Sequence, residues 1–353
     1  MIRVLVVDDS ATVRTLLTQI LGEDPEIQIV GEACDGEEAI RFTEWLRPDL
    51  ITMDILMPRL DGLAATKEIM IRFPTPIVLV TSSQKAREVE SSLASLGNGA
   101  LDVLEKPIGP LAPQFEESSA RLIATVKGMS QVKVIRHWRH ASTPSVTAKD
   151  LDHWLKSSSS GFLTPKDVRS RVVAIVASTG GPAALQTLLS HLPGDFPVPI
   201  LIVQHITPGF ADGLVAWLKC SCQLEVKLAE NGEKLLRRTV YIAPDGQHLG
   251  VSKLGTVALS TAAPIRGFRP SGTFLFESVA RAFGLSSLAV ILTGMGEDGV
   301  AGLSAVRRAG GRIIAQNEAT SVIFGMPGTA IASGVVDVVL PLDEIAARIA
   351  SLV

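Results

Sequence analysis

Residues 2–21 of the chain read IRVLVVDDSATVRTLLTQIL, and all but one of the first six are apolar. Consecutive Val, Leu and Ile residues are typical of a strand that is buried on both faces of a parallel sheet. The acidic turn that follows, and the apolar spacing of residues 12–21, predict that a helix comes next. A strand, a short turn and a helix form the repeating unit of α/β proteins, so this stretch already indicates the fold class.

The same unit recurs along the first third of the chain. Five stretches predict strands, at residues 2–7, 28–33, 49–54, 76–81 and 102–106. Helical periodicity follows each of them, at residues 12–21, 36–45, 62–72, 86–96 and 113–126. Five strands that alternate with five helices predict a doubly wound (βα)5 domain, whose ligands bind at the carboxyl ends of the strands. We assign this domain to residues 1–125.

A connector and a second α/β domain follow. Residues 126–170 include the Ser-rich run SSSSG at 157–161, which is typical of a flexible linker. The alternation of strand and helix patterns then resumes with RVVAIVA. The strand patterns of this part lie at residues 171–177, 199–205, 240–244, 288–293, 311–316 and 335–340. We therefore expect a second doubly wound domain with a mostly parallel sheet over residues 171–353.

The charge is distributed unevenly over these three parts, although the net charge of the whole chain is only −3. Residues 1–125 hold 11 Lys and Arg against 20 Asp and Glu, residues 126–170 hold 8 against 3, and residues 171–353 hold 14 against 13. A basic stretch can indicate nucleic-acid contact, but short Ser-rich linkers are often charged as well. We therefore expect no nucleic-acid partner.

Composition also bears on the compartment in which the protein works. The chain has three cysteines, Cys34, Cys220 and Cys222, which are too few for a disulfide scaffold and fit a reducing compartment. Two thiols spaced as Cys220 and Cys222 do not make a zinc site without further ligands. No uncharged apolar run approaches the ~18 residues that a membrane span needs, and acids occur too early for a signal peptide. We expect a cytoplasmic protein without direct membrane insertion.

Five polar residues stand at strand ends in the first domain. Asp8 and Asp9 follow the first predicted strand, Asp54 ends the third, Thr81 ends the fourth and Lys106 ends the fifth. Any one of them could be an ordinary loop residue, but all five at one edge of a sheet are hard to explain by chance. A carboxylate nucleophile, a Mg²⁺ site, a hydroxyl and an ammonium together suit a phosphoryl group.

Three residues of the second domain also stand at strand ends. Ser178 lies in the turn of RVVAIVASTGGPAALQTLL, His205 ends LIVQH, and Asp298 lies in LAVILTGMGEDGVAGL between a strand and a helix. A serine at such a turn either caps the helix or exposes its hydroxyl near free helix N–H groups, which can stabilise an oxyanion. Serine, histidine and aspartate can act as nucleophile, general base and orienting carboxylate.

Other interpretations of the second domain stay open. Gly294, Gly296 and Gly299 satisfy G-x-G-x-x-G, with Glu318 at about the distance of ~20 residues expected for a dinucleotide-binding fold. Against an oxidoreductase of this kind, Glu297 and Asp298 would bring negative charge to the pyrophosphate. Neither the Walker lysine pattern nor G-x-S-x-G is present. A further alternative is that the second domain is the output domain of the first and binds partners without catalysis.

Over about 120 residues, the first domain resembles the receiver domains of two-component response regulators, through VVDDS, MDILMPRLDG, VTSS and EKP. The resemblance implies that Asp54 accepts a phosphoryl group from a sensor histidine kinase. It implies that Asp8, Asp9 and Asp54, with the backbone at Leu56, hold Mg²⁺, and that Thr81 and Lys106 bind the phosphoryl oxygens. The switch position, usually aromatic in that family, is Val103 here.

The segments STGGP, LIVQH, VYIAPDGQHL, RPSG and ILTGMGEDG resemble the chemotaxis protein-glutamate methylesterases, the CheB family. The resemblance implies hydrolysis of glutamate γ-methyl esters on methylated chemoreceptors, deamidation of receptor glutamines, and no cofactor for the esterase. Ser178, His205 and Asp298 match its triad, and Thr179 and Met295 match positions of its oxyanion site. RPSG departs from the more common form of that motif. The resemblance also implies that the unphosphorylated receiver restrains the esterase.

Overall fold

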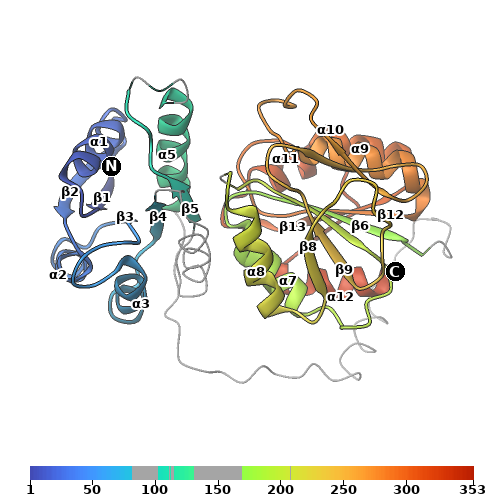
Figure 1. Cartoon of the computed structure of the whole chain (residues 1–353), viewed down its shortest axis with the longest axis horizontal. Helices are drawn as coiled ribbons and strands as arrows, with labels where there is room; N and C mark the ends of the chain where they lie inside the picture. Colours follow the sequence, from blue (N-terminus) through green and yellow to red (C-terminus); the bar gives the residue numbers. More distant parts are fainter. Residues whose placement is uncertain (82–101, 111, 113–114, 131–168, 207) are drawn as a thin grey trace.

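The computed structural model of the chain describes residues 1–81, 102–110, 112, 115–130, 169–206 and 208–353. Two α/β units are seen, one at each end of the chain (Figure 1). The helix expected at 86–96, and nearly all of the expected linker, lie outside the described residues. Among the described helices, none has the length and apolar content that crossing a lipid bilayer would require.

The first unit is built on a five-stranded parallel sheet with the order β2-β1-β3-β4-β5. Its strands are β1 (Ile2–Val7), β2 (Ile27–Ala33), β3 (Leu50–Met53), β4 (Ile77–Thr81) and β5 (Asp102–Glu105). Val7 of β1 pairs with Met53 of β3, so the residues that follow them, Asp8 and Asp54, leave the sheet side by side. The observed strand order and the shared edge are those of a doubly wound sheet, the fold class predicted for this domain.

The described helices of this unit are α1 (Ala11–Gly22), α2 (Gly36–Leu46), α3 (Gly62–Arg72) and α5 (Phe115–Met129). Side chains of Ser10, Asp35 and Asp61 cap the first three at their N-termini. Helix α5 runs three residues beyond the predicted end at 126, because Val126 and Met129 are both buried in the core of this unit. The domain limits at 125 and 170 remain predictions.

The second unit has a seven-stranded sheet with the order β14-β13-β12-β6-β7-β9-β8, in which every recorded pairing is parallel. Its strands are β6 (Val172–Ala177), β7 (Ile200–Gln204), β8 (Glu225–Leu228), β9 (Thr239–Ile242), β12 (Ser287–Ile291), β13 (Arg312–Gln316) and β14 (Val338–Leu340). A separate antiparallel pair is formed by β10 (His248–Val251) and β11 (Val257–Ser260). The sequence patterns did not predict β8, β10 or β11, and β14 begins three residues later than expected.

Both faces of the second sheet are covered by helices. Alternate residues of β6 belong to two different cores, with Val173 and Ile175 in one and Val172 and Ala174 in the other. The helices are α7 (Gly181–Ser190), α8 (Ala211–Ser221), α9 (Gly272–Phe283), α10 (Val300–Arg308), α11 (Met326–Ala332) and α12 (Leu342–Leu352), with short 3-10 turns at Gly284–Ser286 and Glu318–Thr320. Residues of α7, α8 and α12 contribute to the first core and residues of α9, α10 and α11 to the second.

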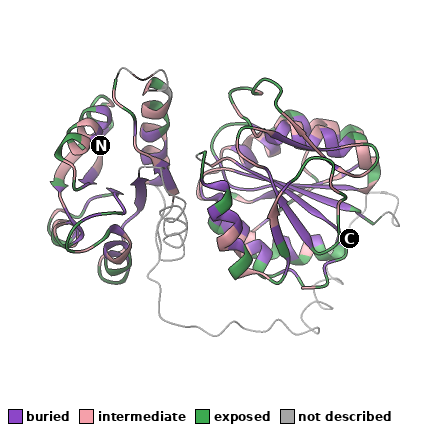
Figure 2. Ribbon diagram, in the orientation of Figure 1, coloured by how far each residue is buried: buried purple, intermediate pink, exposed green. Residues whose placement is uncertain are grey.

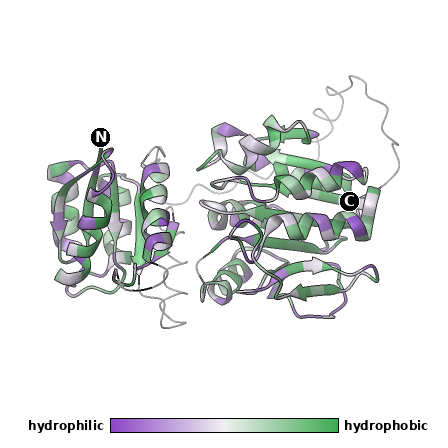
Figure 3. Cartoon of the chain, turned by 90° about the horizontal axis from the view of Figure 1, so that it is seen from above, coloured by the Kyte–Doolittle hydropathy of each residue, from purple (hydrophilic) through white to green (hydrophobic). Residues whose placement is uncertain are grey.

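The central strands β6, β7 and β12 are buried along their whole length (Figure 2). Hydrophobic residues gather in the sheets and on the inner helix faces, and hydrophilic ones lie mainly outside (Figure 3). This burial on both faces explains why the strands read as continuous Val, Ile and Leu runs rather than as alternating patterns. The predicted fold class, two doubly wound α/β domains, is confirmed.

Candidate functional sites

The carboxyl ends of three central strands bring Ser178, His205 and Asp298 to one edge of the second sheet. Ser178 directly follows β6, His205 directly follows β7, and Asp298 lies in the loop after β12. The backbone N–H of His205 donates to the carbonyl of Ala177 over 2.9 Å. The backbone N–H of Ser178 donates to the carbonyl of Thr293 over 3.0 Å, which joins the β6 and β12 ends.

His205 and Asp298 form a buried pair. Nε2 of His205 lies 2.9 Å from Oδ2 of Asp298, and both side chains are almost wholly shielded from solvent. The imidazole also stacks on Phe268, with ring centroids 4.3 Å apart. Nδ1 of His205 is buried and has no partner among the described residues. This leaves Nδ1 as the ring nitrogen available to accept a proton, with the Nε2 hydrogen directed to the carboxylate.

Asp298 is held as an ionised carboxylate. Burial alone would raise its pKa, but hydrogen bonds and charge from His205, the N–H of Gly272 and the hydroxyl of Ser271 together lower the pKa of Asp298 well below its usual value. Oδ1 accepts from Ser271 Oγ over 2.9 Å, and Oδ2 accepts from the N–H of Gly272 over 2.6 Å. A carboxylate fixed in this way can orient an imidazole and stabilise its protonated form.

Gln204, the last residue of β7, joins the turns that carry the serine and the histidine. Its side-chain amide donates to the carbonyl of Ser178 over 2.8 Å and to the carbonyl of His205 over 2.9 Å. The amide is buried, so these two bonds satisfy a donor group that would otherwise be costly to shield from water. The positions of the candidate nucleophile and base are therefore coupled through one side chain.

The glycine-rich loop after β12 packs directly onto Ser178. A Cβ atom at Gly294 would lie 2.6 Å from the Cβ of Ser178, so only glycine fits there. This close approach explains why the first residue of the G-x-G-x-x-G pattern is glycine, and no bound nucleotide is needed to explain it. Asp298 in the same loop is buried against α9, and exposed Glu297 pairs with Arg266. These features disfavour a pyrophosphate site at residues 294–299.

Thr179 and Met295 lie on the two loops that flank Ser178. The carbonyl of Thr179 accepts from the hydroxyl of Thr293 over 3.0 Å, which holds the turn after β6 to the end of β12. Met295 immediately follows Gly294, and its side chain is partly exposed. The assignment of Thr179 and Met295 to an oxyanion site remains a prediction.

In the first unit, the predicted phosphoacceptor site comes together around Lys106. Its Nζ lies 2.8 Å from Oδ2 of Asp8 and 2.9 Å from Oδ2 of Asp54, and both carboxylates are buried. The backbone N–H of Lys106 donates to the carbonyl of buried Thr81 over 2.9 Å, which places the ends of β4 and β5 together. Burial raises the pKa of Asp54 to about 6, and the charge of Asp8 also raises it, whereas Lys106 and the N–H of Ile55 lower it.

The acids at this edge fit a hard divalent cation. One carboxylate oxygen from each of Asp8, Asp9 and Asp54 lies within 4.8 Å of the others, and Asp9 is exposed to solvent. Mg²⁺ prefers a small number of carboxylate oxygens and keeps several waters, which the open side at Asp9 allows. Val103, at the predicted switch position, is buried in β5 opposite Leu79.

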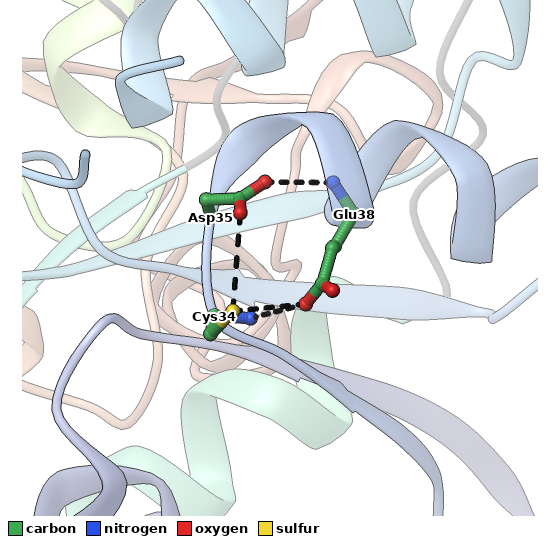
Figure 4. Close-up of side chains that lie close together, drawn as sticks. All are labelled: Cys34, Asp35 and Glu38. Carbon is green, nitrogen blue, oxygen red and sulfur yellow. Dashed lines mark hydrogen bonds between the residues drawn. The ribbon is translucent and has the colours of Figure 1, made fainter. Parts of the chain in front are cut away.

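A second cluster of possible ligands, Cys34, Asp35 and Glu38, is explained by the start of α2 (Figure 4). Asp35 caps the helix by accepting from the N–H of Glu38 over 2.8 Å, and it pairs with Arg59. Glu38 accepts in return from the backbone N–H and the thiol of Cys34, each over 3.0 Å, which lowers the pKa of Glu38. The reciprocal bonds resemble a capping box and leave these groups satisfied without a metal.

Helix α5 of the first unit contacts the second unit close to the triad. A Cβ atom at Gly128 would lie 2.5 Å from Cδ1 of Ile323, and the neighbouring Val322 packs against the core that contains Val126. A cavity of about 580 Å³ at this contact is lined from both units, by Asp24, Ala120, Ile123, Ala124, Lys127, Gly128, Met295 and Ile323. Ile323 in turn bonds to Thr293 through its N–H over 2.9 Å. A chain of contacts thus runs from α5 to the Ser178 turn.

Sequence reasoning missed four residues of the site, which are Gln204, Phe268, Ser271 and Thr293. Ser271 had a detectable signal, since Ser-Gly-Thr after a proline and before an amphipathic stretch indicates a helix start. The other three act through contacts between distant segments, which no local pattern reveals. Phe268 meets His205 across 63 positions of the chain, and Thr293 meets Thr179 across 114.

Known protein families match both halves of the chain. Residues 173–349 match the family model of the CheB methylesterase, and residues 4–112 match that of the response regulator receiver domain. A protein-glutamate methylesterase/protein-glutamine glutaminase of Myxococcus xanthus is 49% identical over 350 residues, which are 99% of this chain and 96% of that protein. A protein of the same name from Anaeromyxobacter dehalogenans is 49% identical over 354 residues, covering 99% of this chain and 98% of the relative.

Among solved structures, the crystal structure of the Thermotoga maritima CheB methylesterase catalytic domain is similar to the second unit. It is 40% identical, with a TM-score of 0.51, and the match covers 53% of this chain and 100% of that one. The two family models and the full-length relatives together account for both halves of the sequence.

Proposed function

The chain belongs to the CheB methylesterase family, with a response-regulator receiver domain before its esterase domain, and from this we propose that it hydrolyses glutamate γ-methyl esters on chemoreceptors. The observation that carries the proposal is the buried His205–Asp298 pair beside the Ser178 turn. The reaction would release methanol and restore the receptor glutamates. Because the full-length relatives are also named glutaminases, we propose that receptor glutamines are deamidated at the same site.

In the proposed mechanism, Ser178 Oγ attacks the ester carbonyl while its proton passes to Nδ1 of His205. The new C–O bond gives a tetrahedral oxyanion, which Thr179, Met295 and the nearby N-terminus of α7 would stabilise. His205 then donates the proton to the leaving methoxide, and the C–O bond to methanol breaks. Water then enters and gives a proton to His205 as its oxygen attacks the acyl carbon. His205 returns this proton to Ser178 Oγ as the bond between the acyl carbon and Oγ breaks, which releases the glutamate and regenerates both residues. With a glutamine substrate, the leaving group is ammonia.

The direct test of the proposed activity is methanol release. Methylated receptor in membranes, incubated with the whole chain and a small-molecule phosphodonor, should yield methanol in proportion to the esters lost. Unmethylated receptor provides the background. Absence of methanol from methylated receptors of several chemosensory classes would contradict the esterase proposal and favour an output domain that only binds partners.

We propose that Asp54 is the residue that accepts the phosphoryl group from a sensor histidine kinase. A carboxylate oxygen of Asp54 attacks the phosphorus, the bond from phosphorus to the donor nitrogen breaks, and Lys106 and Thr81 receive the phosphoryl oxygens. Asp8, Asp9 and Asp54, with the backbone at Leu56, would hold Mg²⁺, which when bound neutralises the charge that gathers between the carboxylates and the phosphoryl group. The esterase chemistry needs no cofactor in this proposal.

Asp54→Asn should abolish phosphorylation. An amide is a poor nucleophile and a weaker Mg²⁺ ligand than a carboxylate, so no acid-stable, base-labile acyl phosphate should form from a labelled phosphodonor. Glu68→Gln, an exposed acid on α3, is the matched control and should be labelled like the wild type. Retention of the label by Asp54→Asn, or mapping of the label to another residue, would refute the assignment.

We further propose that the unphosphorylated receiver restrains the esterase through the contact of α5 with Ile323. This contact lies next to Met295 and, through Thr293, reaches the turn of Ser178. Phosphorylation changes the output only if the contact free energy differs between the two receiver states, and such couplings are typically ~1–3 kcal/mol. Because Val103 replaces the usual aromatic residue, the signal must leave the phosphorylation site without an aromatic rotamer change.

Gly128→Gln should raise the basal esterase activity of the whole, unphosphorylated chain. A side chain at this position meets Ile323, whereas it leaves the α5 helix itself intact, so the two domains should separate. The rate of methanol release should rise several-fold, within the range of about 5–150-fold typical of allosteric coupling. Gly22→Gln is the control, because nothing lies within 4 Å of a Cβ atom at Gly22. Unchanged basal activity in Gly128→Gln, with normal stimulation by phosphorylation, would exclude this contact as the restraint.

Two further proposals concern where the protein works and with what. We place it in the cytoplasm, where it meets the kinase and the cytoplasmic part of the receptor. We propose no nucleic-acid partner and no direct insertion into the membrane.

A further inference from the structure

The first turn of α9 surrounds the carboxylate of Asp298. Oδ1 accepts from Ser271 Oγ over 2.9 Å and from the N–H of Thr273 over 3.2 Å. Oδ2 accepts from the N–H of Gly272 over 2.6 Å and lies 2.9 Å from Nε2 of His205. Each oxygen of the carboxylate therefore has two partners, and three of the four partners come from the start of one helix.

Ser271 occupies the N-cap position of α9 but does not cap its own helix. Its side chain makes no hydrogen bond to a backbone N–H of the first turn, although serine commonly does so at this position. Asp298, from a loop 25–27 positions away, accepts those N–H groups instead. The hydroxyl of Ser271 is wholly buried and is directed to the same carboxylate.

These contacts have two physical consequences for the pair with His205. They fix the rotation of the carboxylate, because Oδ1 is held by two donors at the start of α9 and Oδ2 is held between α9 and the imidazole. They also withdraw negative charge from it, since hydrogen-bond donors and the positive end of a helix stabilise an anion. A carboxylate with less negative potential favours the protonated imidazole less strongly. The donors at the start of α9 therefore set how much negative charge Asp298 presents to the imidazole.

We propose that Ser271 is a positioning residue of the esterase, which orients Asp298 and sets the charge that this carboxylate presents to His205. The inference rests on the proposed function. Ser271 acts through Asp298 and has no recorded contact with His205 or Ser178.

The other charged groups on the segments around His205 are already engaged. Glu297 pairs with Arg266, and the guanidinium of Arg269 donates to the carbonyls of Thr261 and Ala262. On the loop after β9, Asp245 accepts from the N–H of Gly209 over 2.6 Å. Among the described residues, Asp298 is the charged group bonded to His205. The effect of a substitution at Ser271 on the pH profile should therefore arise mainly from the pair of His205 and Asp298.

The test is the pH dependence of kcat/KM for methanol release by the whole chain carrying Ser271→Ala. The acidic limb of this pH profile, where the rate rises with pH, should move to higher pH by about 0.5–1 unit. Without the Ser271 hydroxyl, the carboxylate of Asp298 keeps more of its negative charge and stabilises the imidazolium more strongly. The plateau of kcat should fall about 10-fold through looser orientation, while KM stays near that of the wild type. Ser271→Thr keeps the hydroxyl and should return the limb towards its original position.

Ser278→Ala is the matched control, since this buried serine on α9 bonds to Leu275 and Val251 rather than to Asp298. It should leave the acidic limb in place. If Ser271→Ala fails to fold, Ser271→Cys, which is nearly isosteric and a weaker donor, should shift the limb in the same direction by less. A lower rate at every pH without a shift of the limb would assign Ser271 to stability alone and overturn the proposal. A wild-type chain that releases no methanol would instead overturn the proposed function.

Discussion

Ser178→Ala should reduce ester hydrolysis by on the order of 10⁴-fold or more while leaving the fold intact. The hydroxyl is the proposed nucleophile, and without it no acyl-enzyme can form at residue 178. Members of a triad act as a unit, so removal of the nucleophile alone should cost nearly as much as removal of all three. The loss should appear in kcat, measured as methanol released from methylated receptor, because the hydroxyl is needed for the chemical step.

Two controls make the result specific. Ser190→Ala removes an exposed hydroxyl at the far end of α7, which bonds only to nearby groups of the same helix end, and should leave the rate unchanged. Phosphorylation of Asp54 should be normal in Ser178→Ala, which verifies that the receiver is folded, and an unchanged thermal unfolding curve of the whole chain verifies the same for the esterase unit. Turnover near that of the wild type would end the serine-esterase proposal.

His205→Ala should be nearly as damaging as Ser178→Ala, and Asp298→Ala should be less damaging by about one to two orders of magnitude. In the proposed mechanism, the imidazole takes the serine proton and returns it to methanol, whereas the carboxylate orients the ring and stabilises its charged form. Asp298→Ala should also lower the free energy of unfolding by about 1 kcal/mol, because the first turn of α9 loses the group that accepts its N–H bonds.

The control for the histidine is His191→Ala. His191 is exposed at the end of α7 and its Nδ1 lies 2.6 Å from the carbonyl of Thr187, so its removal should not affect turnover. Kinetics with methylated receptor should rank the variants as His205→Ala, then Asp298→Ala, then His191→Ala, from the slowest to the fastest. High activity in His205→Ala together with its loss in His191→Ala would mean that the wrong base has been assigned.

Much of the architecture was accessible from the sequence because its strands are buried on both faces. Long Val, Ile and Leu runs mark β6, β7 and β12, and the residue after each run stands at the sheet edge where ligands bind. This is why Ser178 and His205 could be placed without a structure. The family predicted from STGGP, LIVQH and ILTGMGEDG is confirmed by the matches along the whole chain.

The remainder depends on contacts between segments far apart in sequence. Strand β8 lies at the sheet edge with polar residues along it, and β10 and β11 have only four residues each, so their patterns are too short to stand out. Nε2 is the ring nitrogen of His205 that faces Asp298, and residue spacing does not encode this choice. The role of Ser271 emerges only once Asp298 is seen at the start of α9.

Residues 322 and 323 touch both α5 and the turn that carries the serine, and this double contact limits how the two domains can be exchanged during evolution. Val322 fills the space beside Gly180, and Ile323 meets Gly128. A receiver borrowed from another protein would need a small residue where Gly128 stands, because a larger one would meet Ile323, separate the two domains and release the proposed restraint. The receiver and the esterase are thus separate folds but not freely interchangeable modules, and they are expected to be inherited as a matched pair.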